Sequence, residues 1–169
     1  MPKDIIYITP EGLVQIVDAI QSFDYVNNEE LPHYDEEQAG IDDFFSLIDR
    51  IKNDTYYPDV FSKATALFLY LNTSHYFSNG NKRLAVFTLL SFLQDNGFEM
   101  IVTSKENFRH IMTDIFGEVG YEDFDNFSDV DFAMYNFAII TAQFNKNGVD
   151  FDTAKQQVQQ FISTVFECT

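Results

Sequence analysis

The chain has 169 residues, of which 46% are hydrophobic and 22% are charged. It is long enough to bury a core without disulfides or structural metals, and too apolar for a disordered polar segment. Ten Lys and Arg residues stand against 27 Asp and Glu residues, which gives a net charge of −17. That balance argues against nucleic acid and anionic membranes as partners, because both are held by basic surface.

Neither disulfides nor membrane spans are expected. Cys168 is the only cysteine in the sequence, so an intrachain disulfide and a cysteine metal cluster are excluded. No apolar run approaches the roughly 20 residues that cross a bilayer, and the first residues do not form a signal-peptide pattern. We therefore expect a cytoplasmic protein that makes no contact with a membrane.

Helices dominate the predicted elements, since seven Gly and four Pro residues are too few for an all-β chain. A short extended piece is expected over Ile5 to Ile8, followed by a helix that Thr9 caps and Pro10 opens. The polar stretch from Asn27 to Gly40 predicts a loop. Apolar residues at helical spacing from Ile41 to Ile51 predict a second helix.

Two central helices follow. Pro58 opens a helix that runs to about Ser74 and is apolar on nearly every face, which is typical of a buried helix. The next helix begins near Lys82 and stops at Gly97. A polar loop from His75 to Asn81 joins the two.

The last third predicts a strand and three more helices. Phe98 to Val102 is the strand candidate, Ser104 caps the next helix, and helices are expected over about 130–144 and 152–166. The run from Asp114 to Asp131 has seven acidic residues and no Lys or Arg. It predicts a solvated face, with a docking surface for a basic partner as the alternative. Altogether we expect an all-α domain of six or seven helices.

Lys82 and Arg83 form the only adjacent basic pair in this acidic chain. They stand at a predicted helix start, directly after Gly80 and Asn81. The first N–H groups of a helix lack acceptors and lie at the positive end of the helix dipole. A Gly-containing turn can point them into a concave site that suits phosphate. Because cations are disfavoured at this end of a helix unless an anion offsets them, we predict an anion site here.

His75 lies on the same loop. Histidine titrates near neutral pH and can take a proton from a hydroxyl group. Phe77 is expected to anchor the loop in the core. A base, an anchor and a phosphate cradle within nine residues are the groups that phosphoryl or nucleotidyl transfer needs. His33 and His110 lack such a setting, and we predict no role for them.

The nine residues from His75 to Arg83, HYFSNGNKR, closely resemble the signature of the Fic/Doc (Fido) family, H-x-F-x-[D/E/N]-G-N-[G/K]-R. The agreeing positions are His75, Phe77, Gly80, Asn81, Lys82 and Arg83. The opening from Tyr7 to Glu11 is similar to the start of the short Doc-like branch. The resemblance covers about residues 5–102 and is weak beyond.

This resemblance implies a single domain over 1–169, with a core of about 5–102 and a helical C-terminal extension of about 103–169. The expected fold is the Fic-fold helical bundle, with the motif loop between two central helices. In the family a flap before these helices aligns the target by strand-like pairing. Leu31 to Gly40 is the candidate for such a β-hairpin flap.

The resemblance also implies residue roles. By position, His75 is the general base. Gly80 and Asn81 form the anion cradle, while Lys82 and Arg83 hold the phosphates. Arg83 is counted with His75 as a catalytic residue, because it stabilises charge on the transferred group.

Two positions depart from the common pattern. Asn79 occupies the metal-ligand position, where a carboxylate often binds Mg²⁺. An amide brings no charge and should bind the metal more weakly. Tyr76 replaces a frequent Pro. The inhibitory pattern of many relatives, Ser or Thr followed four residues later by Glu and then by Gly or Asn, is absent from the sequence, so restraint is expected from a separate antitoxin chain.

The function implied is transfer of AMP or a phosphoryl group from ATP, with Mg²⁺, to a hydroxyl side chain of a target protein. Such an enzyme is a protein adenylyltransferase or a Doc-like protein kinase, here expected as the toxin of a toxin–antitoxin pair. Lys82 and the short chain favour the Doc-like orientation of ATP. Two alternatives stay open: a nucleotide-binding module with weak turnover because of Asn79, and transfer to a phosphorylated small molecule. Homo-oligomers are also compatible with the sequence.

Overall fold

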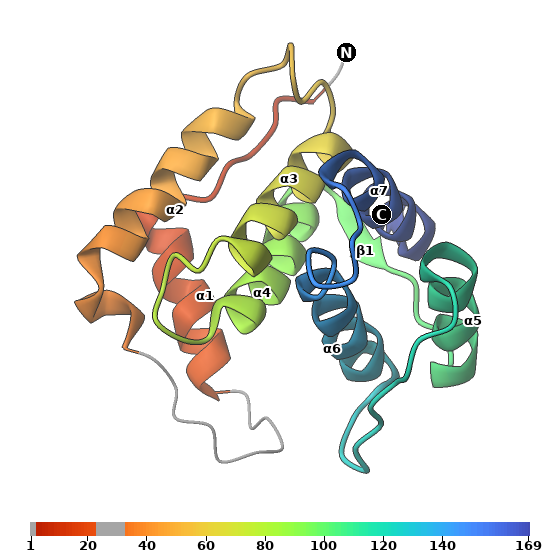
Figure 1. The fold of residues 1–169 in the computed structure, drawn as a ribbon. Helices are drawn as coiled ribbons and strands as arrows, with labels where there is room; N and C mark the ends of the chain where they lie inside the picture. Colours follow the sequence, from red (N-terminus) through yellow and green to blue (C-terminus); the bar gives the residue numbers. More distant parts are fainter. Residues whose placement is uncertain (1–2, 23–32) are drawn as a thin grey trace.

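The computed structural model describes residues 3–22 and 33–169. These residues form seven α-helices, one 3-10 helix and one two-stranded sheet, which confirms the all-α prediction. Helices α3 (Val60–Thr73) and α4 (Asn81–Asp95) run through the middle of the molecule, and the other helices flank them on two sides (Figure 1). In the described part of the chain no helix combines the length and apolarity needed to cross a membrane.

The N-terminal helices cover one side of the central pair. Helix α1 (Pro10–Ser22) packs against α4, and α2 (Gln38–Ile51) packs against α3. The Gly12 N–H donates to Thr9 Oγ1 at 3.1 Å, which confirms Thr9 as the helix cap. Helix α2 begins three residues before the predicted start at Ile41.

Helix α3 is buried along most of its length, as its apolar sequence predicts. Its cap is Asp59, whose side chain accepts from the Ser62 N–H at 2.8 Å, so the helix starts at Val60 and not at Pro58. Even Lys63 is fully buried. Its ammonium donates to the Ile51 carbonyl at 2.7 Å and contacts Asp54 at 2.8 Å, which supplies the partners that a buried cation requires.

The C-terminal helices cover the other side of α3 and α4. They are α5 (Lys105–Phe116), α6 (Asp129–Ala142) and α7 (Phe151–Val165). Ser104 caps α5 as predicted, by accepting from the Asn107 N–H at 3.1 Å. Helix α6 contacts both α3 and α4, and α7 contacts α3.

The predicted strand exists, as β1 (Phe98–Met100). Its antiparallel partner is β2 (Phe166–Cys168), with Glu99 opposite Glu167. The sequence predicts a helix up to about 166 and does not reveal the strand that follows α7. A three-residue strand at the chain end has no periodicity of its own, and pairing with β1 is what defines it.

Residues 33–40, the described part of the segment assigned to the β-hairpin flap, contain no strand. Leu31 and Pro32 lie outside the described residues, and the rest of the segment is helical: η1 (Tyr34–Glu36) leads directly into α2. The physical reason is burial. Tyr34 is 2% exposed and packs edge-on against Phe77 at 5.2 Å, which ties the segment to the core as a helical turn.

The acidic run from Asp114 to Asp131 lies mostly on the surface, as a solvated face does. Six of its seven carboxylates are exposed, and Asp131 is half-buried in the capping box of α6. Asp123 pairs with Lys105 at 2.8 Å. The interleaved aromatic residues point the other way, since Phe127 is buried and Phe124 is half-buried against the core.

One close contact in the N-terminal half allows a stability prediction. Gly40 lies in α2, where an added Cβ would lie 2.7 Å from the Phe77 ring and 2.7 Å from the Tyr76 carbonyl oxygen. We expect Gly40→Ala to lower the free energy of unfolding by about 1–3 kcal/mol, because the backbone and ring must move apart. Urea denaturation measures this change.

Gly120→Ala is the matched control, since a Cβ there meets nothing within 4 Å. Equal midpoints for the two variants would contradict the proposed contact between α2 and the motif loop.

Candidate functional site

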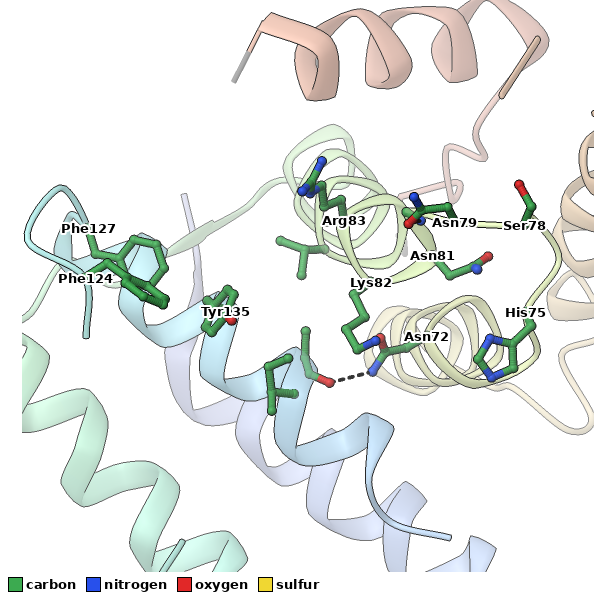
Figure 2. Close-up of a pocket in the computed structure, with 14 residues that line it drawn as sticks. Asn72, His75, Ser78, Asn79, Asn81, Lys82, Arg83, Phe124, Phe127 and Tyr135 are labelled. Carbon is green, nitrogen blue, oxygen red and sulfur yellow. Dashed lines mark hydrogen bonds between the residues drawn. The ribbon is translucent and has the colours of Figure 1, made fainter. Parts of the chain in front are cut away.

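A cavity of about 330 Å³ opens where α3 ends and α4 begins. Its polar side comes from the loop between these helices and the first turn of α4. Its apolar side comes from α6 and the segment before it (Figure 2). The structure brings six of the seven predicted site residues to this cavity: His75, Asn79, Gly80, Asn81, Lys82 and Arg83. The seventh, Phe77, is 2% exposed and lies in the core beneath the loop, where an anchor was expected.

The Asn81 side chain closes the loop. Its Nδ2 donates to the Phe77 carbonyl at 2.8 Å, and its Oδ1 accepts from the Phe77 N–H at 3.0 Å. Asn81 itself is 9% exposed. Because buried backbone groups must be paired, these two hydrogen bonds replace those that a helix or sheet would provide. The side chain of Asn81 therefore holds the loop closed.

The first turn of α4 is electropositive. Gly80 is its N-cap, with a left-handed φ of 73°, and no side chain caps the helix. The first turn has no acidic residue. Lys82 is exposed there and Arg83 is half-buried, and both line the cavity. Uncapped N–H groups with two cations beside them are an arrangement that favours a bound anion.

His75 is exposed at the rim of the cavity, directly after α3 (Figure 2). Its φ is 53°, and it is the one residue other than glycine with a positive φ in the described part of the chain. A left-handed residue of this kind costs free energy and persists where the surrounding structure fixes it. Here the fixed ends are the buried helix α3 and the buried Phe77.

The model of the Fic/DOC family matches residues 7–93, slightly more than half of the chain. The protein belongs to the Fic/DOC family. Its motif loop and both central helices fall in the matched range, apart from the last two residues of α4. No curated protein and no solved structure matches the chain. Members of the family are known in general for transferring nucleotide or phosphoryl groups onto target proteins.

Asn79 offers little to a cation in this Fic/DOC protein. Its Oδ1 accepts from the Gly80 N–H at 2.6 Å, so this oxygen is already engaged in a hydrogen bond. Among residues 3–22 and 33–169, no three His, Cys, Asp or Glu side chains come together as a metal cage. The residues present therefore do not fit a tightly held Mg²⁺. A metal here would need the oxygens of a phosphate ligand and water for most of its coordination.

Apart from Val86 on α4, the apolar side of the cavity lies outside the matched family range. The part outside that range consists of Phe124 and Phe127, which precede α6, and of Tyr135, Ala138 and Ile139 on α6. The aromatic rings pack together, with centroid distances of 5.8 Å between Phe124 and Tyr135 and 5.2 Å between Phe127 and Tyr135. Sequence reasoning missed these residues, because the motif gives no sign of what faces it. An aromatic pattern inside an acidic run was the one available signal.

Two side chains from the N-terminal half hold the loop from outside, and neither could be predicted from the sequence. The Tyr34 hydroxyl donates to the Gly80 carbonyl at 2.9 Å. The Glu37 carboxylate accepts from the Ser78 N–H at 2.8 Å and from the Ser78 hydroxyl at 2.9 Å. The loop is thus bound to η1 and to the residue before α2.

This bracing can be measured at one amide. We expect Glu37→Ala to raise the hydrogen-exchange rate of the Ser78 N–H by about tenfold, since a charge-assisted acceptor is lost. Ser78→Ala is the matched control, because it removes the hydroxyl and keeps the backbone bond to Glu37. NMR-detected exchange distinguishes the two. An unchanged rate in Glu37→Ala would mean that the loop holds its shape without this carboxylate.

Proposed function

We propose that this Fic/DOC protein transfers AMP or a phosphoryl group from ATP to a hydroxyl side chain of a target protein. The observation that carries the proposal is the cavity that joins an uncapped, cationic helix start to an exposed histidine. Phosphates and a proton acceptor are needed side by side for this chemistry. The family membership supports the same class of reaction.

The phosphates are assigned to the α4 end of the cavity. The backbone N–H groups after Gly80 and the cations of Lys82 and Arg83 supply positive charge there. These groups are already in place, so they stabilise the charge of a transferring phosphoryl group without reorganising. The cavity volume of about 330 Å³ lies at the lower end of the range for small-molecule sites.

The base of the nucleotide is assigned to the α6 side. Phe124, Phe127 and Tyr135 offer aromatic surface there, and apolar walls with a few polar groups are typical of cofactor and nucleotide pockets. In this assignment the polar end selects the phosphates and the aromatic end selects the base.

In the proposed reaction His75 acts as general base. Its imidazole takes the proton of the target hydroxyl, the hydroxyl oxygen forms a bond to phosphorus, and the bond from that phosphorus to its leaving oxygen breaks. Attack at the α-phosphorus releases pyrophosphate and leaves AMP on the target. Attack at the γ-phosphorus releases ADP and leaves a phosphoryl group. Lys82 and Arg83 balance the charge that spreads over the phosphoryl oxygens.

Magnesium, where bound, neutralises charge on the triphosphate. Asn79 is the side chain assigned to it. The oxygen of Asn79 is neutral and already accepts from Gly80, so we assign the metal a weaker role here than a carboxylate would give it.

The biological role proposed is that of a toxin held in check by a separate antitoxin chain. The sequence lacks the inhibitory pattern that many relatives carry in cis. The net charge of −17 favours basic proteins over nucleic acids as partners of the solvent-exposed surface. Cytoplasmic location belongs to the same proposal.

A second candidate function is a nucleotide-binding module with weak turnover. The Oδ1 of Asn79 already accepts a hydrogen bond, which favours this second function. Weak metal binding lowers the rate of phosphoryl transfer more than it lowers the affinity for the nucleotide. Calorimetric titration with ATP, followed by a transfer assay on the proteins of a cell lysate, distinguishes the two. Binding without transfer favours the module.

The general-base assignment is tested at His75. We expect His75→Ala to lower the transfer of label from ATP to protein by at least about 10²-fold, since general bases contribute about 10²- to 10⁴-fold. His75→Asn should behave the same, and it suits the left-handed backbone better than Ala does. Mass spectrometry of the modified target distinguishes AMP from phosphate.

His110→Ala is the control, because His110 is exposed on α5 and does not line the cavity. Full activity in His75→Asn would overturn the assignment of the base.

The metal position is tested by restoring a carboxylate. We expect Asn79→Asp to raise the affinity for ATP in the presence of Mg²⁺ by about tenfold, since a charged oxygen binds this cation better than an amide. In the presence of EDTA the variant should gain nothing. Asn147→Asp, at an exposed position away from the cavity, controls for the added charge. Equal Mg²⁺ dependence in all three proteins would remove residue 79 from the metal site.

A further inference from the structure

Asn72 is a buried polar residue that the motif does not include. It lies in the last turn of α3, one turn before His75, and it lines the cavity. Its side chain is 2% exposed. Its amide nitrogen is fully used, because it donates to the Ala138 carbonyl at 3.0 Å and to the Thr141 hydroxyl at 2.7 Å. Its Oδ1 is buried and has no hydrogen-bond partner in the structure.

The neighbours on α6 fix which amide atom is the oxygen. The Ala138 carbonyl can only accept, so the atom facing it must be the nitrogen. The Thr141 hydroxyl donates to the Phe137 carbonyl at 2.9 Å, which leaves its oxygen free to accept from Asn72. Rotating the amide by half a turn would place two acceptors against each other at Ala138. The unpartnered atom is therefore an acceptor, and it needs a donor.

The chemistry of that donor is narrow. An ionised phosphate offers acceptors and almost no donors, so Oδ1 of Asn72 does not suit the phosphates assigned to the α4 end. A hydroxyl or an amino group of a ligand does suit it. Leaving a buried acceptor unpaired costs free energy. Asn72 lines the cavity, and its Oδ1 has no partner among the described residues, so a ligand in the cavity could supply the missing donor.

The position of Asn72 indicates which part of a nucleotide it meets. Figure 2 shows the aromatic residues Phe124, Phe127 and Tyr135 on one side of the cavity and His75 on the other, with Asn72 and Lys82 between them. In the assignment above, the base lies toward the aromatic side and the phosphates lie at the motif. The group between base and phosphates is the sugar.

We propose that Oδ1 of Asn72 accepts a hydrogen bond from a ribose hydroxyl of the nucleotide. This proposal rests on the proposed function, and it gives the site a selection for ribonucleotides that the motif alone does not supply. The Asn72 amide has two tasks at once: its nitrogen ties α3 to α6, and its oxygen contacts the ligand.

The test compares four ligands on the full chain by titration calorimetry: ATP, its 2′-deoxy analogue, its 3′-deoxy analogue, and inorganic tripolyphosphate. We expect one of the deoxy analogues to bind about tenfold more weakly than ATP to the unchanged protein. Asn72→Leu, which is nearly isosteric, should lose the same factor for ATP. The variant and the unchanged protein should bind that deoxy analogue with equal affinity, and they should also bind tripolyphosphate with equal affinity.

Thr141→Val is the matched control. It breaks the bond between Asn72 and Thr141 and keeps the carbonyl acceptor, and Thr141 does not line the cavity. If Asn72 matters only for joining α3 to α6, both variants will weaken ATP and tripolyphosphate equally. That result would overturn the proposal. A loss of tripolyphosphate binding in Asn72→Leu alone would assign Asn72 to the positioning of Lys82, and would overturn it as well.

Inosine triphosphate separates the two possible donors, since it lacks the amino group of adenine and keeps both hydroxyls. Normal binding of this ligand, together with weaker binding of a deoxy analogue, supports the ribose. Weak binding of inosine triphosphate with normal binding of both deoxy analogues would move the contact to the base and refute the proposal. If Asn72→Leu does not fold, the analogue series on the unchanged protein still tests the contribution of the ribose hydroxyl, and equal binding of both deoxy analogues and ATP still overturns the proposal.

Failure of the further inference is distinct from failure of the proposed function. If ATP binds and both deoxy analogues bind equally well, the ribose contact is wrong and the nucleotide site stands. If neither ATP nor tripolyphosphate binds, the nucleotide site itself is wrong.

Discussion

The pair of hydrogen bonds between the Asn81 side chain and the Phe77 backbone is the constraint on which the site depends. The chain must leave α3, turn, and enter α4 within a few residues while its backbone is partly buried. One amide side chain satisfies both backbone groups of Phe77 at the point of the turn. The Phe77 ring then fills the core below. With the loop closed in this way, the start of α4 is left uncapped and His75 is left at the rim.

The charges of the molecule act at two ranges. At short range, Lys82 and Arg83 and the helix start make a local positive site in a chain of net charge −17. At longer range the acidic surface dominates, although salt screens it beyond about 8 Å at physiological ionic strength. An anionic ligand is therefore attracted only once it has entered the cavity. The acidic surface attracts a basic protein from further away, in agreement with the proposed transfer to a target protein.

The site is shared between the family region and the C-terminal third. Residues within the matched range supply the polar side of the cavity, and α6 and the segment before it supply the apolar side. Asn72 connects the two halves through its bonds to Ala138 and Thr141. The C-terminal third is also held at its end, because β2 pairs with β1 directly after α4. The extension is thus a wall of the cavity as well as a cover for the core.

Most of the helices and the chemistry of the motif loop could be predicted from the sequence alone. Helical periodicity, Thr9 and Ser104 as caps, and the motif from His75 to Arg83 are local signals, and local signals can be read without knowing the fold. The residues that lie opposite the motif, and those that hold the motif loop in place, could be identified only in the tertiary structure. Tyr34 and Glu37 contact the loop across more than 40 residues of sequence, and Asn72 meets α6 across 66. Tertiary structure also made the segment after His33 a helical turn, because burying Tyr34 against Phe77 outweighs any local preference for a hairpin. Such long-range pairings have no spacing or period that a sequence displays, so only the packed chain could reveal them.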